Sequence, residues 1–304
     1  MQWTKNKEQM ALLLGCGLAL ALILFVVFAK YSNNSASMRT VYENILEKKR
    51  VLNEIRVDLL KSVEMEKNAV MALTDQESLA YASQSRIAAA SVDQNLKALR
   101  AMVDAMPAEK KLLEEFATCW TEMGKIDQVI LQLAVENTNL KAAALSREQG
   151  GLSMQRFEKA LERVRASSTG NSSESQVTAL AARAMVAALK IFNLHGPHII
   201  EPNNEKMDQL EARMKAEETV VMQSLSGLEE IFGNDPPETI IQAKTAFVEF
   251  LAVTSQVVQL SRLNSNIKSL ELSMGRKRTV AAQCDDALAA LQESVQQKTF
   301  KATK

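Results

Sequence analysis

Both histidines of the chain lie in one short stretch together with a glutamate. His195, His198 and Glu201 form the pattern H-x-x-H-x-x-E. Imidazole nitrogens and carboxylate oxygens are ligands that zinc takes in proteins, so the chemistry this pattern suggests is metal binding. Gly196 and Pro197 place the donors on a loop, however, and only three ligands are visible. We therefore favour a solvated loop at the tip of a helical bundle and keep the three residues as candidate metal ligands.

Two asparagines interrupt apolar helix faces at equivalent positions. The segment N-T-N-L-K-A-A-A-L-S at 137–146 returns as N-S-N-I-K-S-L-E-L-S at 264–273, and the copies begin with Asn137 and Asn264. Apolar residues precede and follow both at helical spacing, so the two side chains are predicted to face a core. A lone polar residue there typically fixes helix register or partner choice. We favour this structural role; a ligand contact inside a bundle is the functional alternative.

Two large aromatic side chains also occupy equivalent positions. Trp120 and Phe247 are separated by the same offset as Asn137 and Asn264. Both are expected to anchor a hydrophobic core, with the lining of a ligand cavity as the alternative. The sequence contains no glycine-rich phosphate loop, no G-x-S-x-G and no H-E-x-x-H. We therefore predict that the protein is not an enzyme and uses no cofactor.

A second pair of similar segments extends the repeat. V-D-Q-N-L-K-A-L at 92–99 reappears as V-M-Q-S-L-S-G-L at 221–228, at nearly the same offset as the asparagine segments. So long a period is too large for a solenoid unit and indicates one domain copied in tandem. The linker between the copies is predicted at 167–173, where serine, threonine, glycine and asparagine cluster.

The composition is typical of long helices and excludes some partners. Apolar residues make up 47% of the chain and aromatic residues 5%. Lys plus Arg and Asp plus Glu number 36 each, so no basic field attracts nucleic acid and no nucleic-acid partner is predicted. Cys16, Cys119 and Cys284 occupy unrelated positions of the repeat. We expect them to be buried free thiols rather than a disulfide scaffold.

Apolar positions recur at three- and four-residue steps along the body, which predicts helices. A capping box at 74–77 starts one helix, Pro107 starts another, and Gly150-Gly151 is predicted to break the chain. The predicted helices are 38–73, 74–104, 107–146 and 153–167, then 175–193, 203–232, 236–272 and 279–299, with turns at 195–204 and 275–278. Four helices with short connections bury their apolar stripes best as an antiparallel bundle. The predicted fold is all-α, with an N-terminal transmembrane helix followed by two tandem antiparallel four-helix bundles at 38–167 and 175–304.

An apolar run near the amino terminus is predicted to cross a membrane. Residues 10–29 contain no charged side chain, and as a helix they extend about 30 Å, the thickness of a hydrocarbon core. We favour an uncleaved signal anchor over cleavage after Ala29 or lipid attachment at Cys16. The short tail at 1–9 carries two lysines, which favours a cytoplasmic tail and an external body. We expect a single-pass protein of the bacterial inner membrane with the bulk of its chain in the periplasm.

A family resemblance accompanies these features. The segment E-M-E-K-N-A-V-M-A-L-T-D at 64–75, the helix start at Pro107 and the anchor that leads directly into a long first helix resemble the four-helix-bundle sensor domain of bacterial methyl-accepting chemotaxis receptors and related histidine kinases. The resemblance covers about 38–167, and the second copy through its similarity to the first. It implies ligand sensing or a signal-related protein interaction. Receptors of this family continue with a second membrane helix and a cytoplasmic coiled coil, which this sequence does not show, so we expect it to act without its own output domain.

The expected function is therefore that of a membrane-anchored, extracytoplasmic, chemoreceptor-like sensor. Its expected partners are the membrane through 10–29, a protein partner or a second copy through helix packing, and a small-molecule ligand. One alternative is a structural envelope scaffold that associates through helix packing and takes no small molecule. Another is a metal-linked role at His195 and His198.

Overall fold

A computed structural model describes residues 2–233 and 237–302, with side chains described for 25–27, 30, 39–233 and 237–297. Every regular element in these ranges is helical, which confirms the predicted all-α class. In chain order the elements are α1 (Gln2–Met71), α2 (Asp75–Val103), α3 (Pro107–Glu136), α4 (Thr138–Leu145), η1 (Ser146–Gly150), α5 (Gly151–Ser167), α6 (Glu174–Ile199), α7 (Asn204–Phe232), α8 (Glu238–Leu263), α9 (Ser265–Leu272), η2 (Ser273–Lys277) and α10 (Arg278–Ala302). Residue 236, where a helix is predicted to begin, lies outside the described residues.

Contacts divide the chain into two compact units. The first takes in Met1–Leu60, Ala88–Trp120 and Ala282–Lys304, and the second takes in Lys61–Ile87 and Thr121–Ala281. Both units therefore receive parts of α1, α2, α3 and α10, because these helices continue from one unit into the other. The elements from α4 to η2 belong wholly to the second unit.

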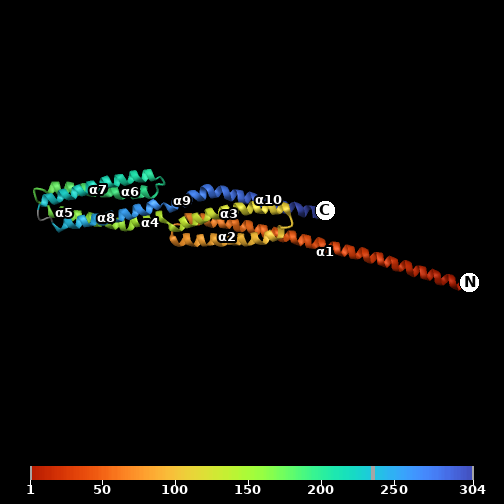
Figure 1. The fold of residues 1–304 in the computed structure, drawn as a ribbon. Coiled ribbons are helices and arrows are strands. Elements are labelled where there is room, and N and C mark those ends of the chain that lie inside the picture. Colours follow the sequence, from red (N-terminus) through yellow and green to blue (C-terminus); the bar gives the residue numbers. More distant parts are fainter. Residues whose placement is uncertain (1, 234–236, 303–304) are drawn as a thin grey trace. The chain divides into compact units, whose positions relative to one another are not determined.

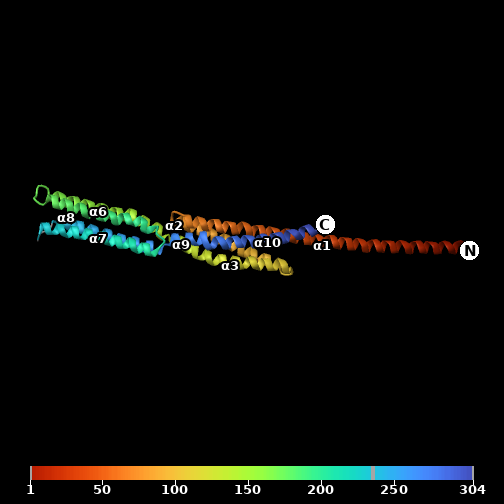
Figure 2. The ribbon, with the colours of Figure 1, turned by 90° about the horizontal axis from the view of Figure 1, so that it is seen from above.

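In the first unit, segments of α1, α2, α3 and α10 lie side by side (Figures 1 and 2). Each contributes buried apolar residues at three- or four-residue spacing, which gives every segment one apolar stripe. These residues include Leu52, Ile55 and Leu59 of α1, Val92, Leu96 and Leu99 of α2, Leu113 and Phe116 of α3, and Leu288 and Leu291 of α10. Polar bonds join the rims of the helices, as where Arg56 Nη1 donates to Gln292 Oε1 at 3.1 Å.

In the second unit, α5, α6, α7 and α8 form a four-helix bundle (Figures 1 and 2). Its core holds Phe157 of α5, Ile191 of α6, Leu225 of α7 and Phe247 of α8, and the rings of Phe157 and Phe247 have centroids 5.3 Å apart. The tandem bundles predicted at 38–167 and 175–304 are therefore not confirmed. The helix α5, predicted as the last of the first bundle, shares its core with three helices predicted for the second.

The physical reason for this correction lies at Gly150 and Gly151. Both have helical backbone angles, with φ of −61° and −60°, because glycine permits a turn without imposing one. Gly150 also packs closely against a neighbouring helix, since a Cβ there would lie 3.2 Å from Cε2 of Phe192. The chain runs on from α4 through η1 into α5, and the predicted linker at 167–173 becomes the turn between α5 and α6. The turn predicted at 275–278 is likewise part of a continuing helix.

Several helix ends follow their local sequence signals. Glu77 N donates to Thr74 Oγ1 at 3.1 Å, which is one of the two bonds of the predicted capping box, and α3 begins at Pro107. Pro107 fits there because the first residue of a helix needs no amide proton. These local signals are confirmed.

The end of α6 differs from the prediction. The helix predicted to stop at 193 continues through Gly196 and Pro197 to Ile199. Pro197 has no amide proton and so removes one backbone hydrogen bond from this turn, and the helix ends two residues later, at Ile199. His195 and His198 therefore lie on a helix and not on the predicted loop, and both are buried.

The side chains of the predicted tail at 1–9 and most side chains of the predicted anchor at 10–29 lie outside the described residues. The backbone of α1 is helical through residues 10–29, and the described side chains at 25–27 are exposed. Among the helices whose side chains are described, which leaves out the apolar run of α1, α6 is the one that is long and apolar enough to span a membrane. Its apolar face lies in the core of the α5–α8 bundle, as expected for a core helix of a folded domain.

Candidate functional site

Two asparagines break two helical paths of the second unit. Asn137 separates α3 from α4, with φ 49° and ψ 38°, and Asn264 separates α8 from α9, with φ 57° and ψ 34°. Within the described chain they are the two non-glycine residues with positive φ. Asparagine adopts this left-handed conformation at lower cost than most residues. The single helices predicted at 107–146 and 236–272 are each two helices for this reason.

The helices α4 and α9, which start after Asn137 and Asn264, cap each other. Thr138 N donates to Ser265 Oγ and Ser265 N donates to Thr138 Oγ1, both at 3.0 Å. Asn139 N donates to Asn266 Oδ1 at 3.1 Å, and Asn266 N donates to Asn139 Oδ1 at 3.2 Å. The first amides of a helix have no partner inside it, and here the opposite helix supplies the caps. We call the following six residues the paired break: Asn137, Thr138, Asn139, Asn264, Ser265 and Asn266.

Side-chain amides add a second layer of bonds to the paired break. Asn266 Nδ2 donates to Asn137 Oδ1 at 2.9 Å, and Asn139 Nδ2 donates to Asn264 Oδ1 at 2.7 Å. Asn137 Nδ2 in turn donates to Asp75 Oδ1 at 2.9 Å, at the start of α2. Asn137 and Asn264 are both buried, and their side-chain amides form hydrogen bonds with other protein groups.

The end of α6 also contacts the paired break. Asn139 Nδ2 donates to the main-chain oxygen of Ile199 at 2.6 Å, and Asn264 Nδ2 donates to that of Glu201 at 3.0 Å. The last carbonyl groups of a helix lack partners within it, so the asparagines satisfy the end of α6. The paired break thus connects the α5–α8 bundle to the parts of α2, α3 and α9 in the same unit.

The repeat also positions two π-helical turns. The turns η1 and η2 follow α4 and α9 and begin at Ser146 and Ser273, which are separated by the same offset as Asn137 and Asn264. A π-turn inserts one extra residue into a helix and is frequent at functional sites. Each turn contributes to a buried polar cluster: η2 through Lys277 and η1 through Ser146.

The charged cluster consists of Glu66 of α1, Asp127 of α3 and Lys277 of η2. Lys277 Nζ lies 2.8 Å from Glu66 Oε2 and 2.5 Å from Asp127 Oδ1, and all three residues are buried. Two carboxylates share one ammonium group, so the fully ionised cluster has a net negative charge. Burial, with a smaller contribution from Glu66, raises the pKa of Asp127 to about 6 against the lowering effect of Lys277. Proton uptake by Asp127 therefore neutralises the cluster in mildly acid solution.

The histidine cluster in the α5–α8 bundle is uncharged. His195 Nδ1 lies 2.8 Å from Ser146 Oγ, and Nε2 lies 3.1 Å from Thr254 Oγ1. The imidazole stacks on Phe250 with centroids 5.9 Å apart. Burial lowers the pKa of His195 to about 4, and His198 adds to the lowering. The ring is consequently neutral at neutral pH.

The two clusters occupy equivalent positions of the repeat. Thr254 follows Asp127 at the offset that separates the two asparagine segments, and His195 follows Glu66 at the offset that separates 92–99 from 221–228. A hydroxyl and an imidazole thus replace two carboxylates. The duplication has kept buried polar groups beside each π-turn while changing their charge.

The ring of His198, the other candidate metal ligand, is engaged by protein groups. Its Nδ1 lies 2.8 Å from Ser261 Oγ and its Nε2 lies 2.9 Å from Glu211 Oε1. Glu201 points elsewhere, because its Oε1 accepts a bond from Asn203 N at 3.0 Å. No group of three His, Cys, Asp or Glu side chains in the described chain is placed to hold a metal ion.

The two aromatic candidates lie in separate cores. Trp120 belongs to the first unit, where its Nε1 donates to Asp93 Oδ1 at 2.7 Å. Phe247 belongs to the α5–α8 bundle, with its ring centroid 5.3 Å from that of Phe157 and 6.2 Å from that of Phe250. Both are buried. Of the four predicted site residues, the structure brings only Asn137 and Asn264 into one network.

Sequence reasoning missed most members of these clusters. Thr138 and Ser265 went unnoticed as caps, although N-T-N and N-S-N contain the residue types that cap helices. Lys277 lies in the stretch predicted as a turn, and its burial leaves no local signal. Glu66 and Asp127 look like any other charged residue of an amphipathic helix.

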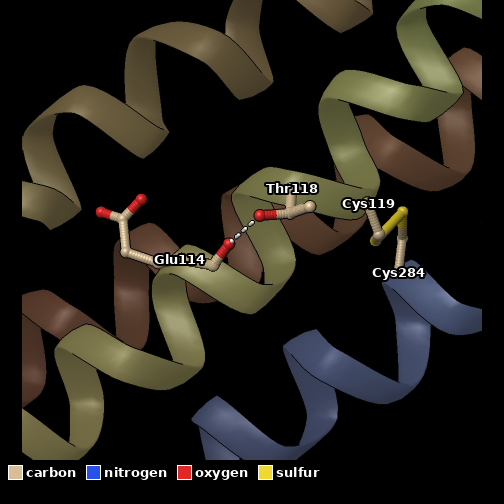
Figure 3. The surroundings of a disulfide bond; sticks show 4 residues. All are labelled: Glu114, Thr118, Cys119 and Cys284. Carbon is tan, nitrogen blue, oxygen red and sulfur yellow. Dashed lines mark hydrogen bonds between the residues drawn. A yellow bond between two sulfur atoms is a disulfide. The ribbon is translucent and has the colours of Figure 1, made fainter.

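Cys119 and Cys284, predicted to be free thiols, form a disulfide in the first unit (Figure 3). The bond joins α3 to α10 with a Cα–Cα distance of 5.6 Å. Beside it, Thr118 Oγ1 donates to the main-chain oxygen of Glu114 at 2.7 Å. The prediction is wrong because it sought cysteine pairs at equivalent positions of the repeat, whereas these two lie on helices that pack within one unit.

Comparison with known proteins relates the chain to one family. A family model described as a four helix bundle sensory module for signal transduction matches residues 7–185, more than half of the chain. No curated protein matches the sequence. The match confirms the resemblance drawn from 64–75 and Pro107.

Proposed function

Because the chain belongs to the family of four-helix-bundle sensory modules for signal transduction, we propose that it senses a stimulus outside the cytoplasm. Residues 10–29 anchor it as a single pass in a bacterial inner membrane, and the helical units lie in the periplasm. The absence of charge over these residues and their length of about 30 Å as a helix support the anchor. In this proposal the stimulus is a small molecule or a protein partner.

The disulfide supports the external location. Disulfides persist in oxidising compartments such as the periplasm and are rare in the cytosol. The bond between Cys119 and Cys284 joins two helices of a core, α3 and α10. A protein whose helices are linked by a disulfide is suited to the outer side of the membrane.

The observation that carries the sensing role is the paired break. Asn137 breaks the helix between α3 and α4, before the chain enters the α5–α8 bundle. Asn264 breaks the helix between α8 and α9, where the chain leaves it. Four reciprocal cap bonds hold the two breaks together. A stimulus that alters the packing of α5–α8 acts on both breaks at once, because neither break can move without releasing caps of the other. Transmission between sites needs an element whose parts move together, and the reciprocal caps give the paired break this property.

Counting free thiols in the full chain tests the location. We expect one free thiol, that of Cys16, in protein quenched with acid from intact cells and tagged under denaturing conditions. Reduction before tagging should give three, because the chain has three cysteines. The variant Cys284→Ala should show two thiols without reduction. Three free thiols in the untreated wild type would place the body in a reducing compartment and contradict the proposal.

Thermal unfolding of the detergent-solubilised chain tests the sensing. A panel of amino acids, organic acids and aromatic compounds and, in separate samples, a periplasmic protein fraction are added to the full chain at one fixed pH. A ligand at about 100 times its Kd should stabilise the folded state by about 2.7 kcal/mol and raise Tm. If no member of the panel and no periplasmic protein fraction shifts Tm, a structural scaffold explains the chain better.

A further inference from the structure

The helix α6 has more apolar surface than its own bundle covers. One face packs in the core of the α5–α8 bundle, where Ala188 and Ile191 are fully buried. Less than half of the residues in its most apolar stretch are buried, however. On the opposite face Val186 is 54% exposed and Leu189 is 40% exposed. A helix that served one bundle alone would carry polar residues at these positions.

The outward residues of α6 form a continuous seam. All six members are exposed and recur at alternating steps of three and four residues, the spacing at which paired helices pack. The seam contains no charged side chain and extends about 27 Å along the helix. An exposed apolar face with a polar rim indicates a surface that another macromolecule covers. We call the following six residues the α6 seam: Ala179, Ala182, Val186, Leu189, Asn193 and Gly196.

The flank of the seam that faces α7 is basic. Lys190 pairs with Glu217 of α7 at 2.9 Å, which places this side of α6 against α7. Arg183 lies two turns before Lys190, on the same side of the helix. Arg213 of α7 lines the same surface hollow as Lys190. No described acid pairs with Arg183 or Arg213, so this flank has a net positive charge.

The flank of the seam that faces α5 carries two glutamates. Arg156 and Arg163 of α5 bond to side chains of α8, so their side of α5 faces α8. Glu158 and Glu162 are exposed and lie on the other side of α5, toward α6. Neither pairs with a cation in the part of the chain that the structure describes.

Glu158 and Arg183 lie at the same level along the bundle, on opposite flanks of the seam. Gly150 is level with Phe192 of α6, since a Cβ on Gly150 would lie 3.2 Å from Cε2 of Phe192. The chain continues from Gly150 into α5, and α6 returns antiparallel to it after a short turn. Eight residues forward along α5 therefore correspond to about eight residues back along α6, which leads from Gly150 to Glu158 and from Phe192 to the turn of Arg183.

We propose that the α6 seam pairs in parallel with the α6 seam of a second copy of this chain. A two-fold axis along α6 brings the α7 flank of each copy beside the α5 flank of the other. Arg183 of one copy then faces Glu158 of the second copy at the same level, and the contact occurs twice in the dimer. An antiparallel pair would bring the two basic flanks together instead, so the charges select the parallel arrangement.

Asn193 favours the same arrangement. In a parallel pair it faces Asn193 of the second copy, and the two side-chain amides can donate to each other. In an antiparallel pair centred near Leu189, the amide would face Val186 and its polar groups would be buried without partners. One polar residue in an apolar seam thus sets the direction of pairing.

The small size of the seam makes membrane anchoring important for the pairing. Two single helix faces bury less than the roughly 1,200 Å² of a standard stable interface. Anchors in one membrane raise the effective concentration of the two seams, and this part of the inference rests on the proposed function. In dilute detergent the anchors occupy separate micelles, and we expect the chain to be monomeric there.

Oxidative cross-linking of the full chain in membranes tests the pairing. Val186→Cys is compared with Val248→Cys, which changes a valine of α8 that is 58% exposed; both variants carry Cys16→Ala. Val186→Cys should give at least about tenfold more of a dimer that reduction dissociates. Equal yields, or no dimer from Val186→Cys, would overturn the proposal.

Recovery of the chain in the membrane fraction is scored separately, because it tests the anchor and not the seam. If the chain is absent from membranes, the anchor is refuted. The same two variants are then cross-linked as concentrated protein, and the same difference in yield decides the pairing. This inference and the proposed function therefore fail separately.

Charge reversal tests the direction of pairing. Arg183→Glu and Glu158→Arg should each lower the dimer yield of Val186→Cys about threefold or more, because like charges then face each other twice. Both reversals together should restore the yield. The control Lys159→Glu reverses an exposed charge on the α8 side of α5 and should change nothing. A higher yield from Arg183→Glu alone, or no recovery in the double variant, would contradict the parallel pair.

Discussion

Replacing Lys277 by methionine is expected to lower the free energy of unfolding by about 3–5 kcal/mol. The ammonium group is the common partner of Glu66 and Asp127, and all three residues are buried. Methionine fills a similar volume but leaves two carboxylates facing each other without a cation. Urea unfolding of the full chain in detergent measures the loss. The control Arg276→Met removes an exposed cation from the same π-turn, where it pairs with Glu122, and should cost less than about 1 kcal/mol.

The decrease in unfolding free energy caused by Lys277→Met should also depend on pH. The pKa of Asp127 is raised from 3.8 to about 6 in the folded protein, so the folded state retains a proton that the unfolded state releases. The contribution of Asp127 to stability is therefore greatest below pH 3.8 and declines as pH rises through about 6. Without Lys277 the carboxyl group resists ionisation further. The destabilisation by Lys277→Met should be larger at about pH 8 than at about pH 5; equal losses at both would contradict the assignment.

Replacing Asn139 by alanine is the second large effect, on the order of 3 kcal/mol. The side chain accepts from Asn266 N and donates to the main-chain oxygen of Ile199 and to Asn264 Oδ1. Its removal leaves three polar groups without these bonds at a largely buried site. Each such group costs about 1 kcal/mol or more. The same unfolding experiment measures the change.

A matched variant controls for the loss of an asparagine side chain as such. Asn193→Ala on α6 removes the same atoms from a position outside the buried core and should change stability by less than about 0.5 kcal/mol. If Asn193→Ala and Asn139→Ala cost the same, the paired break contributes nothing specific to stability.

Local features of the fold followed from the sequence, and its tertiary pairing did not. The capping box at Thr74 and the proline start at Pro107 depend on neighbours within one turn, so their signals are complete in the sequence. Gly150 and Gly151 carry no such signal, because glycine is compatible with a helix and with a turn alike. The packing of Gly150 against Phe192, a residue of another helix, is a tertiary contact that the local sequence does not reveal.

The repeat was visible, but its meaning was not. Comparison of 137–146 with 264–273 identified Asn137 and Asn264 as buried polar positions, yet it suggested two similar domains. The equivalent segments instead meet each other, and Thr138 bonds to Ser265. A sequence repeat shows which residues are similar, but it does not show which residues contact each other. The charged cluster shows the same limit, since Glu66 and Lys277 are 211 residues apart.

A double-mutant cycle between Asn139 and Asn266 tests most directly whether the two halves of the paired break hold each other. The unfolding free energies of the wild type, Asn139→Ala, Asn266→Ala and the double variant give the coupling. Because each side chain caps the amide of the other, the account predicts a coupling of about 1 kcal/mol or more, within the range of contacting pairs. Additive costs, within about 0.3–0.5 kcal/mol, would contradict it.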